Sequence, residues 1–189
     1  MKELEERVLK EGKVLPGGVL KVDSFLNHQI DPEMSMSIAL ELKRLYEGTG
    51  VNKILTVEAS GIALAVFAAY VFGCRAVFAK KSRSSNISDD VYKAEVRSFT
   101  HGNTNTVVCS KEYLGKGDRV LITDDFLAHG EALRGLISIC GQAGAEVVGC
   151  GVAIEKVFQG GGNELREKGI RVESLCRIAS MSDTGLDIQ

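Results

Sequence analysis

The most informative segment of the sequence is residues 120–132, Val120-Leu121-Ile122-Thr123-Asp124-Asp125-Phe126-Leu127-Ala128-His129-Gly130-Glu131-Ala132. Its first residues are apolar or β-branched, which predicts a buried strand. Two adjacent carboxylates follow the strand, and a turn with one glycine leads directly into a helical pattern. The N–H groups and positive dipole end of a helix attract an anion, whereas paired carboxylates attract hydroxyls or cations. A sugar phosphate satisfies both, so the stretch predicts a sugar-phosphate site.

The turn itself contains small residues. Gly130 lets the backbone approach a phosphate without a Cβ, and Ala128 and Ala132 are small at the neighbouring positions. A plainer interpretation is that Asp124 and Asp125 are the polar end of a buried strand, with Asp125 helping to cap the helix. Two acids in a turn do not decide between these interpretations.

The patterns on either side predict an α/β protein, because strands alternate with helices and so imply a largely parallel sheet covered on both faces. Two alternating stretches predict a hairpin around His101-Gly102-Asn103, and a polar run at residues 80–90 predicts a mobile loop. Residues 19–29 look extended or irregular. Strands are expected at residues 53–57, 76–79, 91–100, 104–110, 119–123, 146–154 and 171–177, and helices at residues 4–11, from 31 to near 48, 62–72, 131–143 and ending at 168.

Length and composition exclude several classes of protein. The 189 residues suit one domain, and 44% hydrophobic with 25% charged residues is ordinary for a soluble protein. We find no apolar run long enough to span a membrane and no secretory signal, so we expect a cytoplasmic protein without a membrane partner. A net charge of −2 argues against nucleic acid as a partner. Five cysteines without a C-x-x-C pair are interpreted as reduced, small hydrophobic residues.

Residues 120–132 also resemble the signature of the type I phosphoribosyltransferases, in which two acids and two apolar residues precede a small-x-Gly turn. Residues 19–32 and 154–159 are similar to the bacterial xanthine branch of that family, so the resemblance covers nearly the full chain. It implies the type I phosphoribosyltransferase fold: a central, mostly parallel sheet flanked by helices, a small N-terminal hood at about residues 12–32, and a flexible loop or hairpin.

The resemblance further implies purine salvage. The 5-phosphoribosyl group would pass from 5-phosphoribosyl-1-pyrophosphate (PRPP) to N9 of xanthine, giving xanthosine 5′-monophosphate (XMP) and pyrophosphate. Mg²⁺ is expected to arrive with the pyrophosphate-bearing substrate, since this hard cation prefers phosphate oxygens and no dedicated protein metal cage is visible. A homodimer is also implied.

Residue roles carry over by position. Asp124 and Asp125 would face the ribose hydroxyls. The phosphate loop would hold the 5′-phosphate, although Ala128 and His129 depart from the Thr or Ser and the Thr or Asn common there, which shifts the expected grip to backbone donors. His129 is either an added donor or a solvated imidazole. The phosphate loop consists of Ala128, His129, Gly130, Glu131 and Ala132.

The same resemblance assigns pyrophosphate and purine contacts. Glu58, Ser60 and Gly61 match the pyrophosphate loop, although a Ser-Gly turn is also ordinary helix capping. A Lys156 ammonium would donate to a purine carbonyl oxygen, and Phe158 would either stack on the purine or pack in the core. Other expected contacts are Lys80 and Lys81 to pyrophosphate, and Leu20 and Asn27 to the purine.

Three alternatives were weighed. A guanine or hypoxanthine phosphoribosyltransferase differs by one or two hydrogen bonds to the base, while Lys156 argues against adenine, whose exocyclic amine is a donor. A PRPP-sensing regulator would need a DNA-binding module, yet residues 1–50 hold seven Lys and Arg against nine acids. A dinucleotide-binding domain lacks its G-x-G-x-x-G signature here.

Overall fold

The computed structural model describes residues 1–81, 90–97, 104–182 and 185–189. Its centre is a six-stranded sheet in the order β10-β9-β8-β7-β3-β4, in which only β10 runs antiparallel to its neighbour. The predicted mostly parallel sheet is therefore confirmed. The strands are β3 (Lys53–Val57), β4 (Arg75–Ala79), β7 (Arg119–Leu127), β8 (Glu146–Lys156), β9 (Val172–Ser182) and β10 (Gly185–Ile188).

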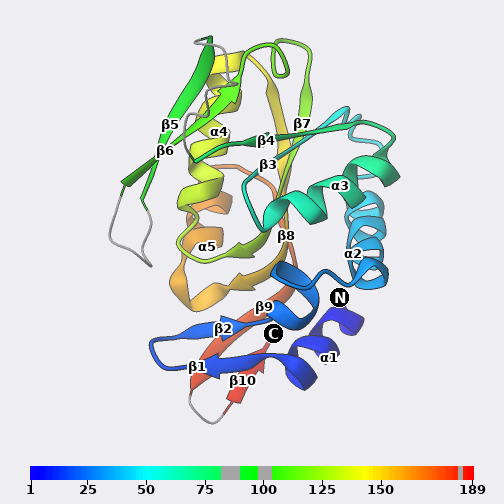
Figure 1. Cartoon of the computed structure of the whole chain (residues 1–189), viewed down its shortest axis with the longest axis vertical. Helices are drawn as coiled ribbons and strands as arrows, with labels where there is room; N and C mark the ends of the chain where they lie inside the picture. Colours follow the sequence, from blue (N-terminus) through cyan, green and yellow to red (C-terminus); the bar gives the residue numbers. More distant parts are fainter. Residues whose placement is uncertain (82–89, 98–103, 183–184) are drawn as a thin grey trace.

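Helices cover both faces of this sheet (Figure 1). On one face, α4 (Glu131–Ala143) and α5 (Gly161–Glu167) pack with a hairpin of β5 (Val91–Arg97) and β6 (Thr104–Ser110). On the other, α2 (Pro32–Leu45) and α3 (Gly61–Phe72) cover the strands. Burial on both faces explains why the central strands read as continuous apolar runs rather than alternating ones.

The N-terminal segment forms a small layer across one end of the sheet (Figure 1). It comprises α1 (Lys2–Glu11), the strands β1 (Lys13–Leu15) and β2 (Val19–Lys21), and a π-helical turn (Asp23–Asn27). Residues 19–29, expected to be extended or irregular, begin with an extended strand: β1 pairs with β2 across a turn in which Gly17 and Gly18 have φ of 85° and 72°. Such positive φ values suit a tight hairpin turn.

Several expected boundaries need correction. The strand of β7 continues to Leu127, so Asp124 and Asp125 lie within its end rather than after it, and β9 extends to Ser182 before turning into the unforeseen β10. Asp31 caps α2 as predicted, with its Oδ1 accepting from the N–H groups of Glu33 at 3.0 Å and Met34 at 3.1 Å. The predicted loop tip at residues 82–89 and the hairpin turn at residues 98–103 lie outside the described residues.

The five cysteines are all free thiols, and four of them are buried, as expected of small hydrophobic residues. Among the helices of the described ranges, none combines the length and the apolar character that crossing a membrane would take.

Candidate active site

A cavity of about 260 Å³ lies where β3 and β7 end and α4 begins. In an α/β sheet, ligands bind beyond the carboxyl ends of the strands, and this cavity occupies that place. The sequence-predicted residues that line it come from the paired acids, the phosphate loop and the proposed pyrophosphate loop. They are Asp124, Asp125, Ala128, His129, Gly130, Glu131, Ala132, Glu58, Ser60 and Lys81.

Asp125 ties three segments of the chain together. One carboxylate oxygen, Oδ1, accepts from the Ser60 hydroxyl at 2.9 Å, and Oδ2 accepts from the Asn27 side-chain amide at 3.1 Å. The end of β7, the turn before α3 and the N-terminal π-helical turn therefore meet at one side chain. Only 6% of Asp125 is exposed, so these hydrogen bonds hold the carboxylate in a fixed position.

Asp124 occupies an apolar and like-charged environment. It is 6% exposed, and its Oδ1 accepts from the backbone N–H of Asp125 at 3.0 Å. Burial, followed by the negative charge of Asp125, raises the pKa of Asp124 well above its ordinary value. A buried carboxyl held this way gains from a hydroxyl donor or a cation. A ribose hydroxyl as the partner of Asp124 therefore stays a prediction beside the plainer interpretation of a strand end.

Gly61 is needed for close packing beneath Asp124. A Cβ at this position would overlap Thr56 Oγ1 and lie 3.1 Å from Asp124 Oδ1. The hydroxyls of Thr56 and Thr123 are buried without a hydrogen-bond partner among the described residues. Polar groups therefore surround the buried end of the site.

The phosphate loop forms the N-terminus of α4. Gly130 has φ of 79°, the left-handed conformation that a residue without a Cβ adopts at little cost, and no side chain caps the helix. The first N–H groups of a helix have no acceptor within it. Residues of this helix N-terminus line the cavity, so backbone donors and the positive end of the helix dipole lie beside it, and the 5′-phosphate contact stays a prediction.

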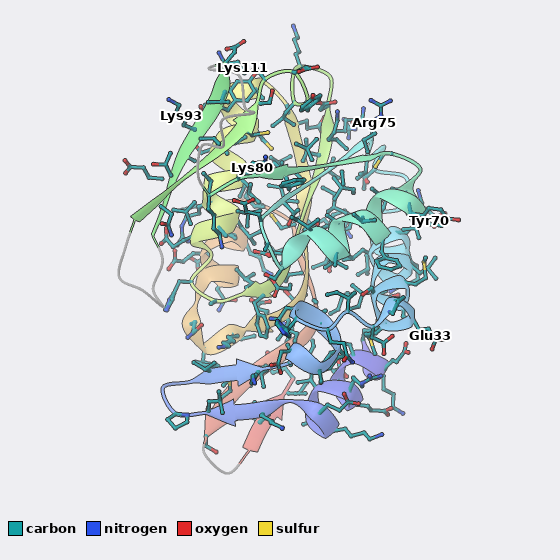
Figure 2. All side chains as sticks on the ribbon, in the orientation of Figure 1. Glu33, Tyr70, Arg75, Lys80, Lys93 and Lys111 are labelled. Atoms are coloured by element: carbon teal, nitrogen blue, oxygen red, sulfur yellow. The ribbon has the colours of Figure 1, made fainter. Side chains whose placement is uncertain are left out.

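The proposed pyrophosphate loop lies across the cavity from α4. Its Glu58-Ala59 peptide is cis, and Glu58 Oε1 accepts from the backbone N–H of Lys81 at 2.7 Å. Lys81 lines the cavity, whereas Lys80 lines a separate groove beside Phe78 and bridges β6 through Val108. Figure 2 shows Lys80 at the end of β4, facing the hairpin. The structure therefore brings Lys81, and not Lys80, to this cavity.

The predicted purine contacts lie at the N-terminal layer. Lys156, at the end of β8, donates from Nζ to the backbone oxygen of Gly18 at 2.9 Å, and burial lowers its pKa. Phe158 is 47% exposed, so core packing does not explain it. Leu20 is buried in the layer's own core, and Asn27 contacts Asp125. None of these four lines the cavity, which leaves their purine contacts as predictions.

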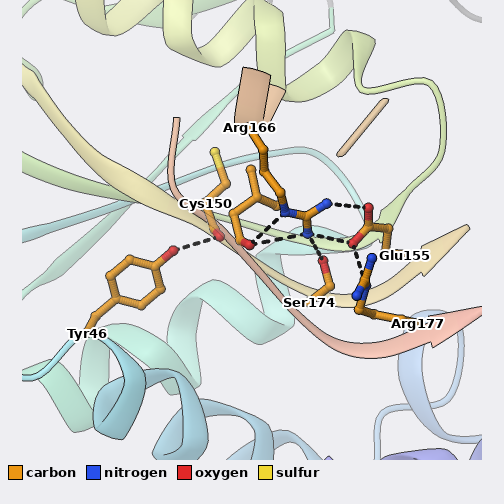
Figure 3. Close-up of polar contacts among 7 residues, drawn as sticks. Tyr46, Cys150, Glu155, Arg166, Ser174 and Arg177 are labelled. Atoms are coloured by element: carbon orange, nitrogen blue, oxygen red, sulfur yellow. Dashed lines mark hydrogen bonds and ion pairs between the residues drawn. The ribbon is translucent and has the colours of Figure 1, made fainter. Parts of the chain in front are cut away.

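Sequence reasoning missed an ion-pair cluster next to Lys156. Glu155 is only 1% exposed and accepts two hydrogen bonds from Arg166, at 2.8 and 2.7 Å, while Arg177 lies 3.6 Å away (Figure 3). Burial alone would raise the pKa of Glu155, but hydrogen bonds from Arg166 and Ser174 and the two positive charges lower it. The only sequence signal was an acid inside an apolar strand, which does not reveal its partner.

Arg134 and the hairpin's contact with the cavity were also missed. Arg134 contacts the backbone oxygen of His129 and the carboxylate of Glu131, and Val96 and Asn105 of the hairpin line the cavity. The spacing of Glu131 and Arg134 on one helix face could have indicated their ion pair. The hairpin's contact with the cavity depends on packing that no local pattern encodes.

Comparison with known proteins agrees with this geometry. The family model described as the phosphoribosyl transferase domain matches residues 23–185. A xanthine phosphoribosyltransferase of Lactobacillus delbrueckii subsp. bulgaricus is 52% identical over 183 residues, covering 97% of both chains. A xanthine phosphoribosyltransferase of Bacillus cereus strain AH187 is 50% identical over 186 residues, covering 98% of this chain and 94% of its own.

Solved structures show the same fold. An adenine phosphoribosyl transferase from Trypanosoma brucei, in complex with AMP, pyrophosphate and ribose-5-phosphate, superposes with a TM-score of 0.77 at 19% identity, covering 96% of this chain and 83% of its own. An adenine phosphoribosyltransferase from Rhodothermus marinus gives 0.76 at 20% identity, covering 94% and 100%. The chain has the type I phosphoribosyltransferase fold and belongs to the phosphoribosyl transferase family.

Proposed function

We propose that this protein transfers the 5-phosphoribosyl group of PRPP to N9 of xanthine, giving XMP and pyrophosphate in purine salvage. The observation that carries the proposal is one cavity lined by both the paired acids and an uncapped helix N-terminus. About 50% identity to xanthine phosphoribosyltransferases over nearly the whole chain supports the choice of base. The proposal treats residues 1–189 as one domain, with the hood at residues 12–32.

The chain's own residues would act mainly by positioning. Backbone donors of the phosphate loop hold the 5′-phosphate, while Asp124 and Asp125 accept from the ribose hydroxyls. As the bond from C1′ to the pyrophosphate oxygen breaks, its electron pair leaves with pyrophosphate. N9 then forms a bond to C1′, and the base releases its proton to water. Fixed groups that match the developing charges lower the barrier without needing a strong base.

The pyrophosphate end would be held by the turn before α3. The N-terminus of α3 offers backbone donors, Ser60 lines the cavity with its hydroxyl bonded to Asp125, and Lys81 lines the same cavity. Lys80 lines the neighbouring groove and remains a predicted contact to the pyrophosphate. Excluding water there protects a ribosyl cation-like transition state from hydrolysis.

Mg²⁺ fits this site as a companion of PRPP rather than as a resident ion. Among the described residues, no group of three or more His, Cys, Asp or Glu side chains could hold a metal. Asp124 and Asp125, buried side by side, would receive the ribose hydroxyls near such an ion. When bound to pyrophosphate, Mg²⁺ would neutralise part of the charge on the leaving group.

The base would lie between the hood and the end of β8. Lys156 can exchange its bond to Gly18 for one to a purine carbonyl oxygen, and the half-exposed ring of Phe158 offers a stacking surface. Asn27 and Leu20 bring the hood to the same place. A homodimer located in the cytoplasm completes the proposal.

The proposal is tested by incubating the protein with PRPP and Mg²⁺ together with xanthine, guanine or hypoxanthine, and following pyrophosphate release. We expect release with xanthine and formation of XMP, identified by mass spectrometry. Release with guanine or hypoxanthine alone would replace the substrate, and no release with any 6-oxopurine would contradict the enzyme proposal.

A further inference from the structure

The phosphate loop is held from outside the cavity. The backbone oxygen of Ala128 accepts from the N–H of Gly161 at 3.2 Å, and that of His129 accepts from Arg134 Nη2 at 2.6 Å. The oxygen of Gly130 accepts from the backbone N–H of Arg134 at 2.9 Å, which is the first bond of α4. Neither Gly161 nor Arg134 lines the cavity. Three successive carbonyl groups of the loop therefore point away from it.

This orientation determines where the loop's donors point. In a trans peptide the C=O and the following N–H are antiparallel, and these peptides are trans. When the three oxygens are held on the outside, the N–H groups of His129, Gly130 and Glu131 turn toward the cavity. Successive backbone N–H groups arranged in this way form a concave anion site. The bonds to Arg134 and Gly161 thus orient the donors before any ligand binds.

Arg134 also controls the charge of the loop. Its Nη2 lies 2.6 Å from Glu131 Oε1, and its Nη1 lies 3.1 Å from Glu164 Oε2 on α5. Glu131 lines the cavity, where an unpaired carboxylate would repel a phosphate. The Arg134 side chain is 27% exposed, so its charge is only partly screened by water. One guanidinium therefore fixes a carbonyl, neutralises Glu131 and connects the loop to α5.

Gly161 supplies the second contact and permits no side chain. A Cβ there would overlap the backbone of the phosphate loop, lying 2.5 Å from the oxygen of Ala128 and 2.6 Å from the nitrogen of Gly130. Because these neighbours are backbone atoms of the loop itself, they cannot yield without moving its N–H donors.

The geometry points to Arg134 as a positioning residue for the 5′-phosphate, acting through the His129 carbonyl and the Glu131 carboxylate, with Gly161 bracing the same loop. This inference rests on the proposed function. It assigns Arg134 no contact with substrate. Its effect should therefore be confined to ligands that carry the 5′-phosphate.

The test compares two ligands that occupy different ends of the site. Binding of ribose 5-phosphate, and separately of pyrophosphate with Mg²⁺, is measured by calorimetry on the wild-type protein and on Arg134→Ala. We expect ribose 5-phosphate to bind about 10- to 100-fold more weakly to Arg134→Ala, the range for losing one or two charge-assisted contacts. Pyrophosphate should bind within about twofold of the wild-type affinity. In turnover, KM for PRPP should rise while KM for xanthine stays unchanged.

Three further variants separate charge from geometry. Adding Glu131→Gln to Arg134→Ala should restore part of the lost affinity, because it removes the unpaired carboxylate. Arg134→Lys keeps the charge but lacks the planar fork, and should give intermediate affinity. Arg171→Ala is the matched control, since Arg171 also binds a backbone oxygen, that of Leu45, and a glutamate, Glu173, away from the cavity. It should leave both affinities unchanged.

Each outcome either supports or overturns the role of Arg134 in positioning the phosphate loop. Wild-type affinity for ribose 5-phosphate in Arg134→Ala would overturn the inference, as would an equal loss of both ligands. If Arg134→Ala fails to fold, the single variants Arg134→Lys and Gly161→Ala take its place. Wild-type affinity for ribose 5-phosphate in both of them would likewise overturn the inference. If the wild-type protein bound neither ligand, the proposed function would fail together with the inference that depends on it.

Discussion

Replacing Arg166 by leucine should destabilise the protein strongly, because it leaves the buried carboxylate of Glu155 without its main partner. Arg166 supplies two hydrogen bonds, at 2.8 and 2.7 Å, to Glu155, which is 1% exposed. Removing one partner of a buried ion pair costs about 3–5 kcal/mol. Arg177 remains 3.6 Å from Glu155 and offsets part of the loss, so we expect the lower end, about 3 kcal/mol. This corresponds to a fall of roughly 6–12 °C in the unfolding midpoint.

The dependence on pH gives the effect a second signature. The pKa of Glu155 is lowered in the folded protein from an ordinary value of 4.5. The pair therefore contributes stability above about pH 4.5, and this contribution is lost as the pH falls through the lowered folded pKa. In Arg166→Leu, burial without the partner should instead raise the pKa of Glu155. The deficit relative to wild type should then shrink as the pH is lowered.

Urea unfolding followed by circular dichroism at pH 7 and at acidic pH measures both effects. Two variants serve as controls. Arg177→Leu, whose side chain is 40% exposed, should cost less than about 1 kcal/mol. Adding Glu155→Gln to Arg166→Leu should recover at least half of the lost free energy of unfolding, since the unpaired carboxylate of Glu155 is then absent. A deficit under about 1 kcal/mol at pH 7, or one that is unaffected by pH and by Glu155→Gln, would refute the reasoning.

Three further predictions concern the cavity and the residues around it. Asp124→Asn should raise the unfolding midpoint at pH 8 but not below pH 3.8, because burial and Asp125 raise the pKa of Asp124 and its ionised carboxylate costs stability as the pH rises. Turnover should fall at least about 100-fold. An unchanged midpoint in calorimetry at pH 8 would count against the stability prediction. Gly61→Ala should destabilise the protein by about 2 kcal/mol and weaken PRPP binding through its clash with Thr56, which unfolding and KM for PRPP measure; wild-type values for both would refute it. Lys156→Gln should raise KM for xanthine about 10- to 100-fold and leave KM for PRPP unchanged. Because burial lowers the pKa of Lys156, the affinity of the wild-type protein for xanthine should decline at a lower pH than an ordinary lysine would give. Equal effects on both KM values would contradict the role of Lys156.

The sequence was most informative where local patterns and fold agree. Strand β3 and helix α4 were predicted closely, because a run buried on both faces and a single apolar helix stripe are distinct patterns, whereas β7 and β9 extend beyond their expected ends. The hairpin turn at Gly17 and Gly18 was not predicted from the sequence, although two successive glycines permit it. Strand β10 was missed because its pairing with β9 depends on a distant register.

The site was predicted in part for the same reason. The paired acids and the phosphate loop are contiguous in sequence, so their proximity follows from one strand and one turn. The contact between Asn27 and Asp125, the bond between Arg134 and His129 and the ion pair of Glu155 with Arg166 join residues whose relative placement is set by tertiary packing. Proximity in sequence was misleading for Lys80. Lys80 and Lys81 are adjacent at a strand end, yet they line different pockets.

The most direct test of the central claim is the rate of pyrophosphate release from PRPP and Mg²⁺ in the presence of xanthine, compared with guanine and hypoxanthine. The proposed function predicts xanthine-dependent release in equal amounts with XMP, abolished in Asp125→Ala while that variant keeps its fold. No release with any 6-oxopurine, or full activity in Asp125→Ala, would contradict it.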